Sequence, residues 1–183
     1  MKQERKIIAL DIGNVCVSIH PERVIARMNL FPTPEILAVS ARLECGLISE
    51  REWLDFFHEK TGHRLNDDEM IDAWNLIIGD TLSGMPEAVR GALKQGYSFV
   101  YLSDVSRFHL TECRRKCEFF HLAVDGVYSF DVGAQKPSAA FFDYVFAHID
   151  GFDRTRALLI GDSPTADIAG GRNAGLATCW VDR

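Results

Sequence analysis

The chain has 183 residues, of which 47% are hydrophobic, and a formal net charge of -6 at pH 7. These values predict a soluble globular protein, either one ordinary domain or a small domain with an insertion. The acidic balance excludes a general nucleic-acid binder, which would show a basic face, yet a few local cations can still hold an anionic substrate. No apolar stretch approaches the roughly 18 residues of a membrane span. The polar start, Met1 to Lys6, is unlike a secretory leader, so we expect a cytoplasmic protein without a membrane partner.

The first predicted element is a buried strand over residues 6–10 that ends at Asp11. From about residue 21 to 79 no strand-like run follows, and helical spacing recurs over 34–44, 49–60 and 66–78. Ser49 and Asn66 each precede a glutamate by three residues, which predicts a capping box at the start of two of these helices.

The second half alternates between helices and strands. Helices are expected over 86–95, 106–117, 138–148 and 165–174, and strands over 97–102, 126–130, 157–160 and 177–181. Such alternation indicates parallel βαβ units. The predicted fold is therefore α/β, a Rossmann-like parallel sheet with a helical insertion after its first strand. Residues 1–19 and 83–183 would form the core, and residues 20–82 the insertion.

The cysteines are odd in number and irregularly spaced, at positions 16, 45, 113, 117 and 179. This pattern is typical of reduced, partly buried thiols and unlike a disulfide framework or a paired zinc motif. Cys113 and Cys117, one helical turn apart, are the one pair that could contact a metal together.

Three polar residues follow predicted strands directly: Asp11, Ser103 and Asp162. In an open parallel sheet the ligand lies at the carboxyl ends of the strands. We therefore expect these side chains to meet in one crevice.

The segments around these residues carry candidate chemistry, although each alone also has a plain structural explanation. The loop Ile12-Gly13-Asn14-Val15 after Asp11 can present a carboxylate and carbonyls to a cation, or simply form a turn. Ser103-Asp104 can offer a hydroxyl and backbone amides to a phosphoryl oxygen, or form a strand-to-helix turn.

Two later segments extend the pattern. Lys136, before Pro137, can neutralise a phosphate and a carboxylate together, or lie on the surface as most lysines do. Asp162 and Asp167 lie five positions apart in the run Gly161-Asp162-Ser163-Pro164-Thr165-Ala166-Asp167. Two carboxylates presented this way suit Mg²⁺, which takes oxygen ligands.

The order of these segments resembles the four motifs of the haloacid dehalogenase-like (HAD) superfamily, over the chain from about Ile7 to Val181. Asn173-Ala174-Gly175 is similar to the helix-to-strand junction of that family. The helical insertion resembles its small α-helical cap, and the turn Glu44-Cys45-Gly46-Leu47-Ile48-Ser49 looks like that of the phosphatase members.

The resemblance implies a Mg²⁺-dependent hydrolase of a small phosphorylated metabolite, in which an aspartyl-phosphate forms and is hydrolysed. It implies catalytic roles for Asp11 as nucleophile, Ser103 and Lys136. The phosphoryl group would be bound by Ser103, Asp104 and Lys136. Mg²⁺ would be held by Asp11, the Gly13 carbonyl, Asp162 and, through water, Asp167.

The chain departs from the family pattern at one position. The family's phosphatases usually carry a second aspartate two residues after the nucleophile as general acid and base, and this chain has Gly13 there. A backbone carbonyl can still bind metal, but Gly13 has no proton to transfer. Asp104 and Asn14 are the nearby side chains that could substitute.

Two rival functions remain open. A haloacid dehalogenase would share the fold and need no metal, which the Asp162/Asp167 pair disfavours. A non-catalytic binding or regulatory protein would explain Gly13. The substrate is expected to lie under the cap. Four cap residues are candidate contacts: Arg42, Trp53, Trp74 and Asn75. Aromatic residues at helical spacing, however, more often form part of the core. Oligomeric state has no sequence signal.

Overall fold

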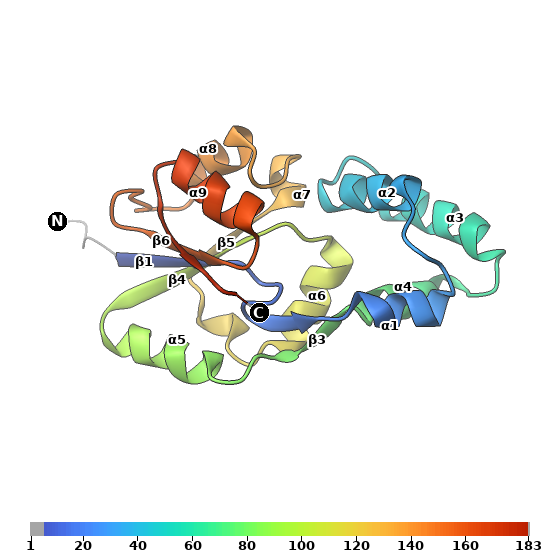
Figure 1. Ribbon diagram of the computed structural model, residues 1–183, viewed down its shortest axis with the longest axis horizontal. Coiled ribbons are helices and arrows are strands. Elements are labelled where there is room, and N and C mark those ends of the chain that lie inside the picture. The colour runs from blue at the N-terminus through green and yellow to red at the C-terminus, as the bar shows by residue number, and fades with distance from the viewer. Residues whose placement is uncertain (1–5, 183) are drawn as a thin grey trace.

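The computed structural model describes residues 6–182, whose centre is a five-stranded sheet in the order β5-β4-β1-β6-β7 (Figure 1). All four neighbouring pairs are parallel. The strands are β1 (Lys6–Leu10), β4 (Tyr97–Ser103), β5 (Asp125–Tyr128), β6 (Leu158–Gly161) and β7 (Ala177–Trp180). The chain starts at the central strand, adds two strands on one side and then two on the other. The predicted α/β fold is confirmed, and the strand order reverses beside β1, where open sheets bind ligands.

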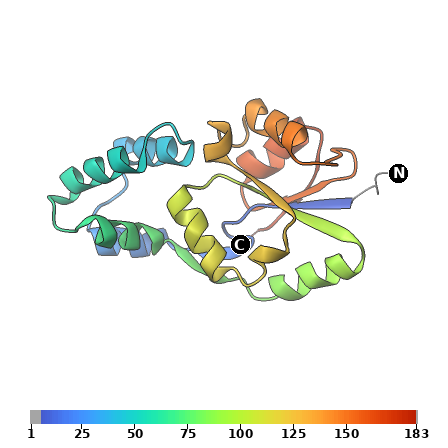
Figure 2. The ribbon, with the colours of Figure 1, turned by 180° about the vertical axis from the view of Figure 1, so that it is seen from behind.

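Helices cover both faces of this sheet (Figure 1, Figure 2). Alternate residues of β1 point to opposite faces. Leu10 joins a core with α5 (Met85–Lys94) and α6 (Arg107–Lys116), whereas Ile7 and Ala9 join a core with α8 (Ala139–His148). The carboxyl end of β1 is therefore fixed from both sides.

A separate group of helices lies beyond the carboxyl ends of the strands (Figure 1): α1 (Pro21–Met28), α2 (Pro34–Glu44), α3 (Glu50–Thr61) and α4 (Asp67–Asn75). They enclose a core of their own around Trp53, Phe57 and Met70. Both predicted capping boxes are confirmed. Ser49 and Asn66 accept hydrogen bonds from the backbone of Glu52 and Glu69, whose side chains bond back to the N-cap amides.

Two antiparallel strands, which sequence reasoning missed, join the helical group to the sheet. β2 (Val17–Ile19) pairs with β3 (Ile78–Thr81). The helix expected over 66–78 ends at Asn75 instead, and α1 was also missed. Gly79 lies within β3, in the region where the sequence predicted no strand. A Cβ at Gly79 would lie 2.1 Å from Ser18 Oγ, so this glycine permits the close approach of the two strands.

Three further segments differ from expectation. The strand expected over 126–130 ends at Tyr128, and a short helix, α7 (Ser129–Val132), follows it. The helix expected over 165–174 is a π-helical turn, Pro164–Ala169, followed by α9 (Gly170–Asn173). A 3₁₀ turn, Phe120–Leu122, precedes β5. None of these differences moves a predicted site residue away from a strand end.

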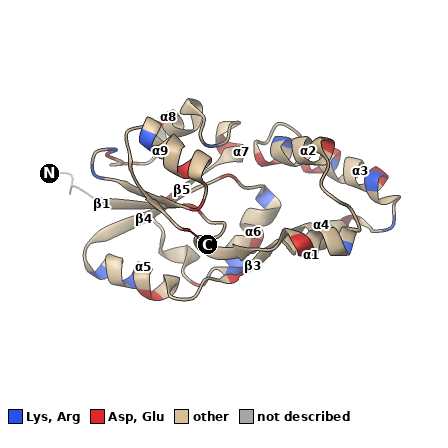
Figure 3. Cartoon of the chain, in the orientation of Figure 1, with Lys and Arg blue, Asp and Glu red and all other residues tan. Residues whose placement is uncertain are grey.

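Acidic and basic residues are interspersed along α2, α3 and α5 (Figure 3). Within residues 6–182, no helix combines the length and the apolarity needed to cross a bilayer. The five cysteines are all free thiols.

Candidate active site

Asp11 is held at the centre of the sheet by the strand ladder. Its backbone N–H donates to the Ile160 carbonyl at 2.9 Å, which extends the pairing of β1 with β6. The chain then turns sharply, because the amides of Cys16 and Val17 both donate to the Ile12 carbonyl. The Asp11 carboxyl, 9% exposed, therefore has a fixed position at the switch point of the sheet.

Lys136 joins two of the carboxylates. Its Nζ donates to Asp11 Oδ1 at 2.9 Å, to Asp167 Oδ1 at 2.6 Å and to the Leu102 carbonyl at 2.8 Å. Burial alone would favour the neutral amine, but the carboxylates of Asp11 and Asp167 offset it and raise the pKa of Lys136. The ammonium is therefore permanently charged, with all three of its protons committed.

Asp167 is fixed by the same cluster. Its second oxygen, Oδ2, accepts the Ser163 N–H at 3.0 Å, and the residue is only 1% exposed. It packs against Gly161, where an added Cβ would lie 2.2 Å from Asp167 Cγ. The glycine before Asp162 is therefore required for Asp167 to reach Lys136.

Asp162 completes a carboxylate cluster. Its Oδ2 accepts a hydrogen bond from Asn14 Nδ2 at 3.0 Å, and Asn14 adopts a left-handed conformation with φ 53°. One oxygen each from Asp11, Asp162 and Asp167 lie within 4.8 Å of one another, and within residues 6–182 no other His, Cys, Asp or Glu group is spaced to hold an ion. Cys113 and Cys117 belong to no group of three or more such ligands there, and a metal contact by this pair alone stays a prediction.

This cluster suits a hard divalent cation. Burial raises the pKa of Asp11, with further help from Asp167 and against the effect of Lys136. Three carboxylates share a single ammonium here, so the charge that remains is negative. A cation with a preference for oxygen would relieve it, and the set resembles the ligands that Mg²⁺ takes.

Ser103 and Asp104 lie beside this cluster at the end of β4. Ser103 is 3% exposed. Asp104 Oδ1 accepts the backbone N–H of Lys136 at 3.1 Å. This bond ties residues 133–138, the lysine loop that contains Lys136, to the end of β4. Burial raises the pKa of Asp104 to about 6, with Lys136 opposing the shift.

A cavity of about 270 Å³ opens over these residues. Five predicted site residues line it: Asp11, Gly13, Ser103, Asp104 and Asp162. Lys136 and Asp167 lie behind that wall. The cavity is also lined by residues that sequence reasoning had not assigned to the site, namely Glu44, His109 and Cys113, and by Trp74, one of the four candidate cap contacts. The other three candidates, Arg42, Trp53 and Asn75, do not line it.

Glu44, the last residue of α2, connects the helical group to the loop that carries Lys136. Its backbone carbonyl accepts a hydrogen bond from Ser129 Oγ, and its Oε2 accepts one from Gln135 Nε2 at 2.8 Å. Burial and the nearby Asp104 carboxyl raise the pKa of Glu44 to about 7, and the bond from Gln135 partly opposes them. The sequence signal was the family-like turn that begins at Glu44.

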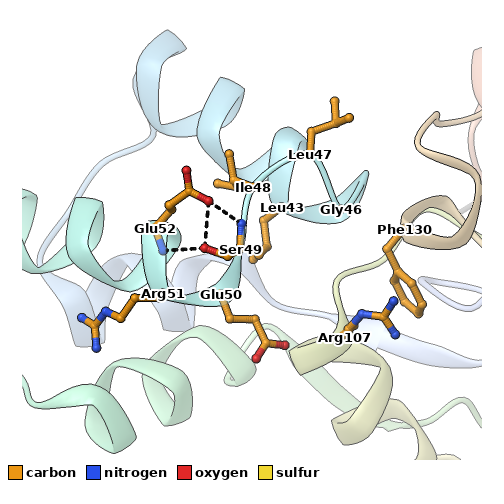
Figure 4. A pocket seen from close by; sticks show the side chains of 10 residues that line it. All are labelled: Leu43, Gly46, Leu47, Ile48, Ser49, Glu50, Arg51, Glu52, Arg107 and Phe130. Atoms are coloured by element: carbon orange, nitrogen blue, oxygen red, sulfur yellow. Dashed lines mark hydrogen bonds between the residues drawn. The ribbon is translucent and has the colours of Figure 1, made fainter.

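A larger groove of about 640 Å³ lies between the α2–α3 turn and the helices α6 and α7 (Figure 4). Arg107 and Phe130 form one wall, and the Arg107 guanidinium stacks 4.2 Å from the Phe130 ring. The groove is lined by none of the predicted site residues. The smaller cavity over Asp11 is therefore the candidate active site.

Comparisons with known proteins agree with this fold. The sequence pattern of the family described as HAD-hydrolase-like matches residues 133–183. A pyrimidine 5'-nucleotidase of Escherichia coli, YjjG, is 38% identical over 95 residues, which cover 52% of this chain and 40% of that protein. A pyrimidine 5'-nucleotidase of Streptococcus pneumoniae, PynA, is 52% identical over 48 residues, 26% of this chain and 20% of that protein. The matched stretches thus span less than half of these curated relatives.

Solved structures match over nearly the whole chain. A HAD family enzyme from Bacteroides thetaiotaomicron superposes with a TM-score of 0.86 at 21% identity, covering 97% of this chain and 94% of that one. A complex of the wild-type form with magnesium and inorganic phosphate superposes with a TM-score of 0.83 at 20% identity, over 96% of this chain and 93% of that one.

The fold and the strand-end carboxylates therefore define an α/β protein of the kind that HAD enzymes form. Residues 133–183 match the HAD-hydrolase-like family, and the whole chain has the fold of solved HAD family enzymes.

Proposed function

We propose that the chain is a Mg²⁺-dependent phosphatase that hydrolyses a small phosphomonoester through an aspartyl-phosphate on Asp11. The observation that carries this proposal is the buried Lys136 ammonium, which joins Asp11 to Asp167 beside Asp162. A carboxylate becomes a useful nucleophile toward phosphorus when nearby cations offset the repulsion between the two anionic groups.

Each residue then has a role set by its contacts. Lys136 holds one Asp11 oxygen and leaves the other available to attack phosphorus. Asp167, with both oxygens bonded by the protein, positions Lys136. The Ser103 hydroxyl and the backbone amide that follows it bind phosphoryl oxygens, while Asp104 holds the backbone of Lys136.

Mg²⁺ fits the carboxylate cluster of Asp11, Asp162 and Asp167. We assign Asp11, Asp162 and the Gly13 carbonyl as its direct ligands, with Asp167 contributing through water. When bound, it would supply positive charge to the phosphoryl oxygens and to the nucleophile. Asn14 orients Asp162 for this purpose through its hydrogen bond.

Residues 20–82 act as the cap of this site. The catalytic cavity shares Glu44, Trp74 and Ile77 with an apolar cavity of about 210 Å³ inside the cap. Neither described lining contains a lysine or an arginine. The leaving group of the substrate is therefore an uncharged group without a second phosphate or carboxylate. A pyrimidine nucleoside 5'-monophosphate, the substrate type named for the curated relatives, is one member of this class.

The alternative is a non-catalytic HAD-like protein, and Gly13 is the observation that favours it. Such a protein would keep the cation and phosphate site but turn nothing over. It would bind beryllium fluoride with Mg²⁺ without hydrolysing any phosphomonoester.

The test is hydrolysis of 4-nitrophenyl phosphate by the purified protein with Mg²⁺ and with excess chelator. We expect activity only with the metal, and its loss in Asp11→Asn, whose amide is nearly isosteric but a poor nucleophile. Asp143→Asn, which alters an exposed carboxylate on α8, is the matched control and should retain full activity. Equal hydrolysis by wild type and Asp11→Asn would refute the nucleophile, and undiminished activity in chelator would refute the metal dependence.

A further inference from the structure

The absence of a side chain at Gly13 leaves the proposed reaction without an obvious proton donor. In phosphoryl transfer the attacking and leaving oxygens lie roughly in line. The nucleophile Asp11 is on the wall formed by the sheet, so the leaving oxygen faces the opposite wall. We take that wall to be the one contributed by the cap, whose residues in the cavity lining are Glu44, Trp74, Ile77 and Ile78.

The titratable groups of the cavity, apart from the metal-site carboxylates, are four: Glu44, Asp104, His109 and Cys113. His109 is buried and its pKa is lowered to about 4, so it is neutral, and its Nε2 is bonded to the Trp74 carbonyl at 3.2 Å. Burial raises the pKa of the Cys113 thiol to about 12, far too high for a donor at neutral pH.

Two other polar side chains of the cavity, Asn14 and Asp104, are poor candidates for the proton donor. Asn14, which the sequence nominated, donates to Asp162 and accepts from the Ile19 amide at 3.2 Å, and an amide has no proton to give at neutral pH. Asp104, like Glu44, has only one carboxyl oxygen bonded, but it follows β4 on the sheet side, beside the nucleophile, and its bonded Oδ1 holds the Lys136 amide.

Glu44 is the one acid that the cap contributes to the cavity lining, and two hydrogen bonds fix its position. Its main chain and its side chain are each bonded to the core, by Ser129 and by Gln135, and Gln135 is the residue before Lys136. Only one carboxyl oxygen is engaged, so the other is available to the cavity. The cap therefore places a carboxylic acid beside the lysine loop.

We propose that Glu44 is the general acid and base of this site, replacing the side chain that Gly13 lacks. The proposal rests on the phosphatase function given above.

The chemical steps balance as follows. The bond between phosphorus and the leaving oxygen breaks as an Asp11 oxygen bonds to phosphorus, and Glu44 gives its proton to that oxygen, which departs as a neutral alcohol. In the second step Glu44, now a carboxylate, takes a proton from water as the water oxygen attacks phosphorus. The bond to Asp11 breaks with its electron pair returning to the carboxylate, so phosphate leaves and both residues are restored.

The charge around Glu44 suits this role at neutral pH. Asp104 faces it from the end of β4, Cys45 adjoins it on its own element, and Gln135 donates to it from the lysine loop. Because burial and Asp104 raise its pKa to about 7, Glu44 is largely protonated below that pH and can both give and accept a proton near it.

The experiment compares Glu44→Gln with wild type on two substrates, phenyl phosphate and 4-nitrophenyl phosphate, with Mg²⁺. A general acid matters most when the leaving group is poor. We expect kcat/KM for phenyl phosphate to fall by about 10² to 10⁴, and for 4-nitrophenyl phosphate by less than about tenfold. The fall of wild-type kcat/KM for phenyl phosphate above about pH 7 should disappear in the variant.

Two further variants sharpen the comparison. Glu59→Gln removes an exposed carboxylate from the cap helix α3 and should change neither rate. Asp104→Asn should lower both rates by the same factor, because Asp104 positions Lys136. A direct check is the pH titration of the Glu44 carboxyl carbon by NMR, with an expected midpoint near 7.

The outcomes separate the two proposals. If Glu44→Gln lowers both rates equally or not at all, or if Glu44 titrates at the ordinary glutamate value of about 4.3, the acid assignment is wrong while the phosphatase function stands. If Asp104→Asn shows the substrate-selective loss instead, Asp104 is the acid. If wild type hydrolyses neither substrate with Mg²⁺, both proposals are refuted.

Discussion

Replacing Lys136 by methionine tests whether the buried ammonium organises the site. Methionine is similar in length and carries no charge. The substitution removes ion pairs of 2.9 and 2.6 Å to Asp11 and Asp167, whose side chains are 12% and 1% exposed. Two buried carboxylates would then face each other without a counter-ion.

The magnitude follows from that burial. Removing one partner of a buried ion pair destabilises a protein by about 3–5 kcal/mol. The effect should depend on pH, because burial already raises the pKa of Asp11 and loss of Lys136 raises it further. A carboxyl with a raised folded-state pKa stabilises the fold at low pH and loses that contribution as pH rises through this pKa. The variant should therefore be less destabilised at about pH 5 than at about pH 7.5.

The assay is urea unfolding without metal at both pH values. At the higher pH we expect the midpoint of Lys136→Met to fall by about 1–3 M. Addition of Mg²⁺ should restore part of the loss, since the cation binds only the folded carboxylate cluster. Lys60→Met is the matched control. It breaks a 2.6 Å ion pair with Glu35 in which both side chains are at least 33% exposed, and should cost no more than about 1 kcal/mol. A Lys136→Met midpoint equal to wild type, or a loss independent of pH, would contradict the arrangement of charges.

Three other predictions follow from the site. Asp162→Ala should weaken Mg²⁺ binding in calorimetric titration more than Asp167→Ala, because both oxygens of Asp167 are already bonded by the protein; the reverse order would place Asp167 as the closer ligand. Gly161→Ala should lower kcat by about 10² or more, because the added Cβ would displace Asp167. Gly91→Ala in α5 is the control, because a Cβ there meets nothing within 4 Å. It should leave kcat unchanged and raise the melting temperature. In a panel of phosphomonoesters, adding a carboxylate to the leaving group should lower kcat/KM by about tenfold or more, and an unchanged value would argue against the cation-free pocket as the leaving-group site.

The α/β fold could be predicted because its signals are local. The apolar run of β1 and the alternation after residue 83 each lie within one stretch of sequence. The β2–β3 pair could not be predicted from the sequence, because its strands have only three and four residues and are about 60 positions apart. The role of Gly79, a close contact with Ser18, exists only after those strands pair.

The same distinction applies to the site. Motif order brought Asp11, Ser103, Lys136, Asp162 and Asp167 into the hypothesis, and the structure places them around one cavity and its buried wall. The spacing of the motifs could not show that Lys136 donates all three of its hydrogen bonds to Asp11, Asp167 and the Leu102 carbonyl.

Glu44 was missed as a site residue for a physical reason. It ends an otherwise ordinary amphipathic helix, and only the packing of the cap on Ser129 and Gln135 carries its carboxyl to the cavity. The raised pKa of Glu44 likewise comes from that burial and from Asp104, which is 60 residues away in sequence.

The identity of Asp11 as the nucleophile is tested most directly by trapping its phosphorylated form. The protein is mixed with a phosphomonoester and Mg²⁺, quenched in acid and treated with borohydride, which reduces an acyl phosphate to the alcohol, and its peptides are mapped by mass spectrometry. We predict reduction at Asp11 alone, only when substrate and metal are both present, and none in Asp11→Asn. Phosphate release at the full rate with Asp11 unmodified at every quench time would contradict the proposed mechanism.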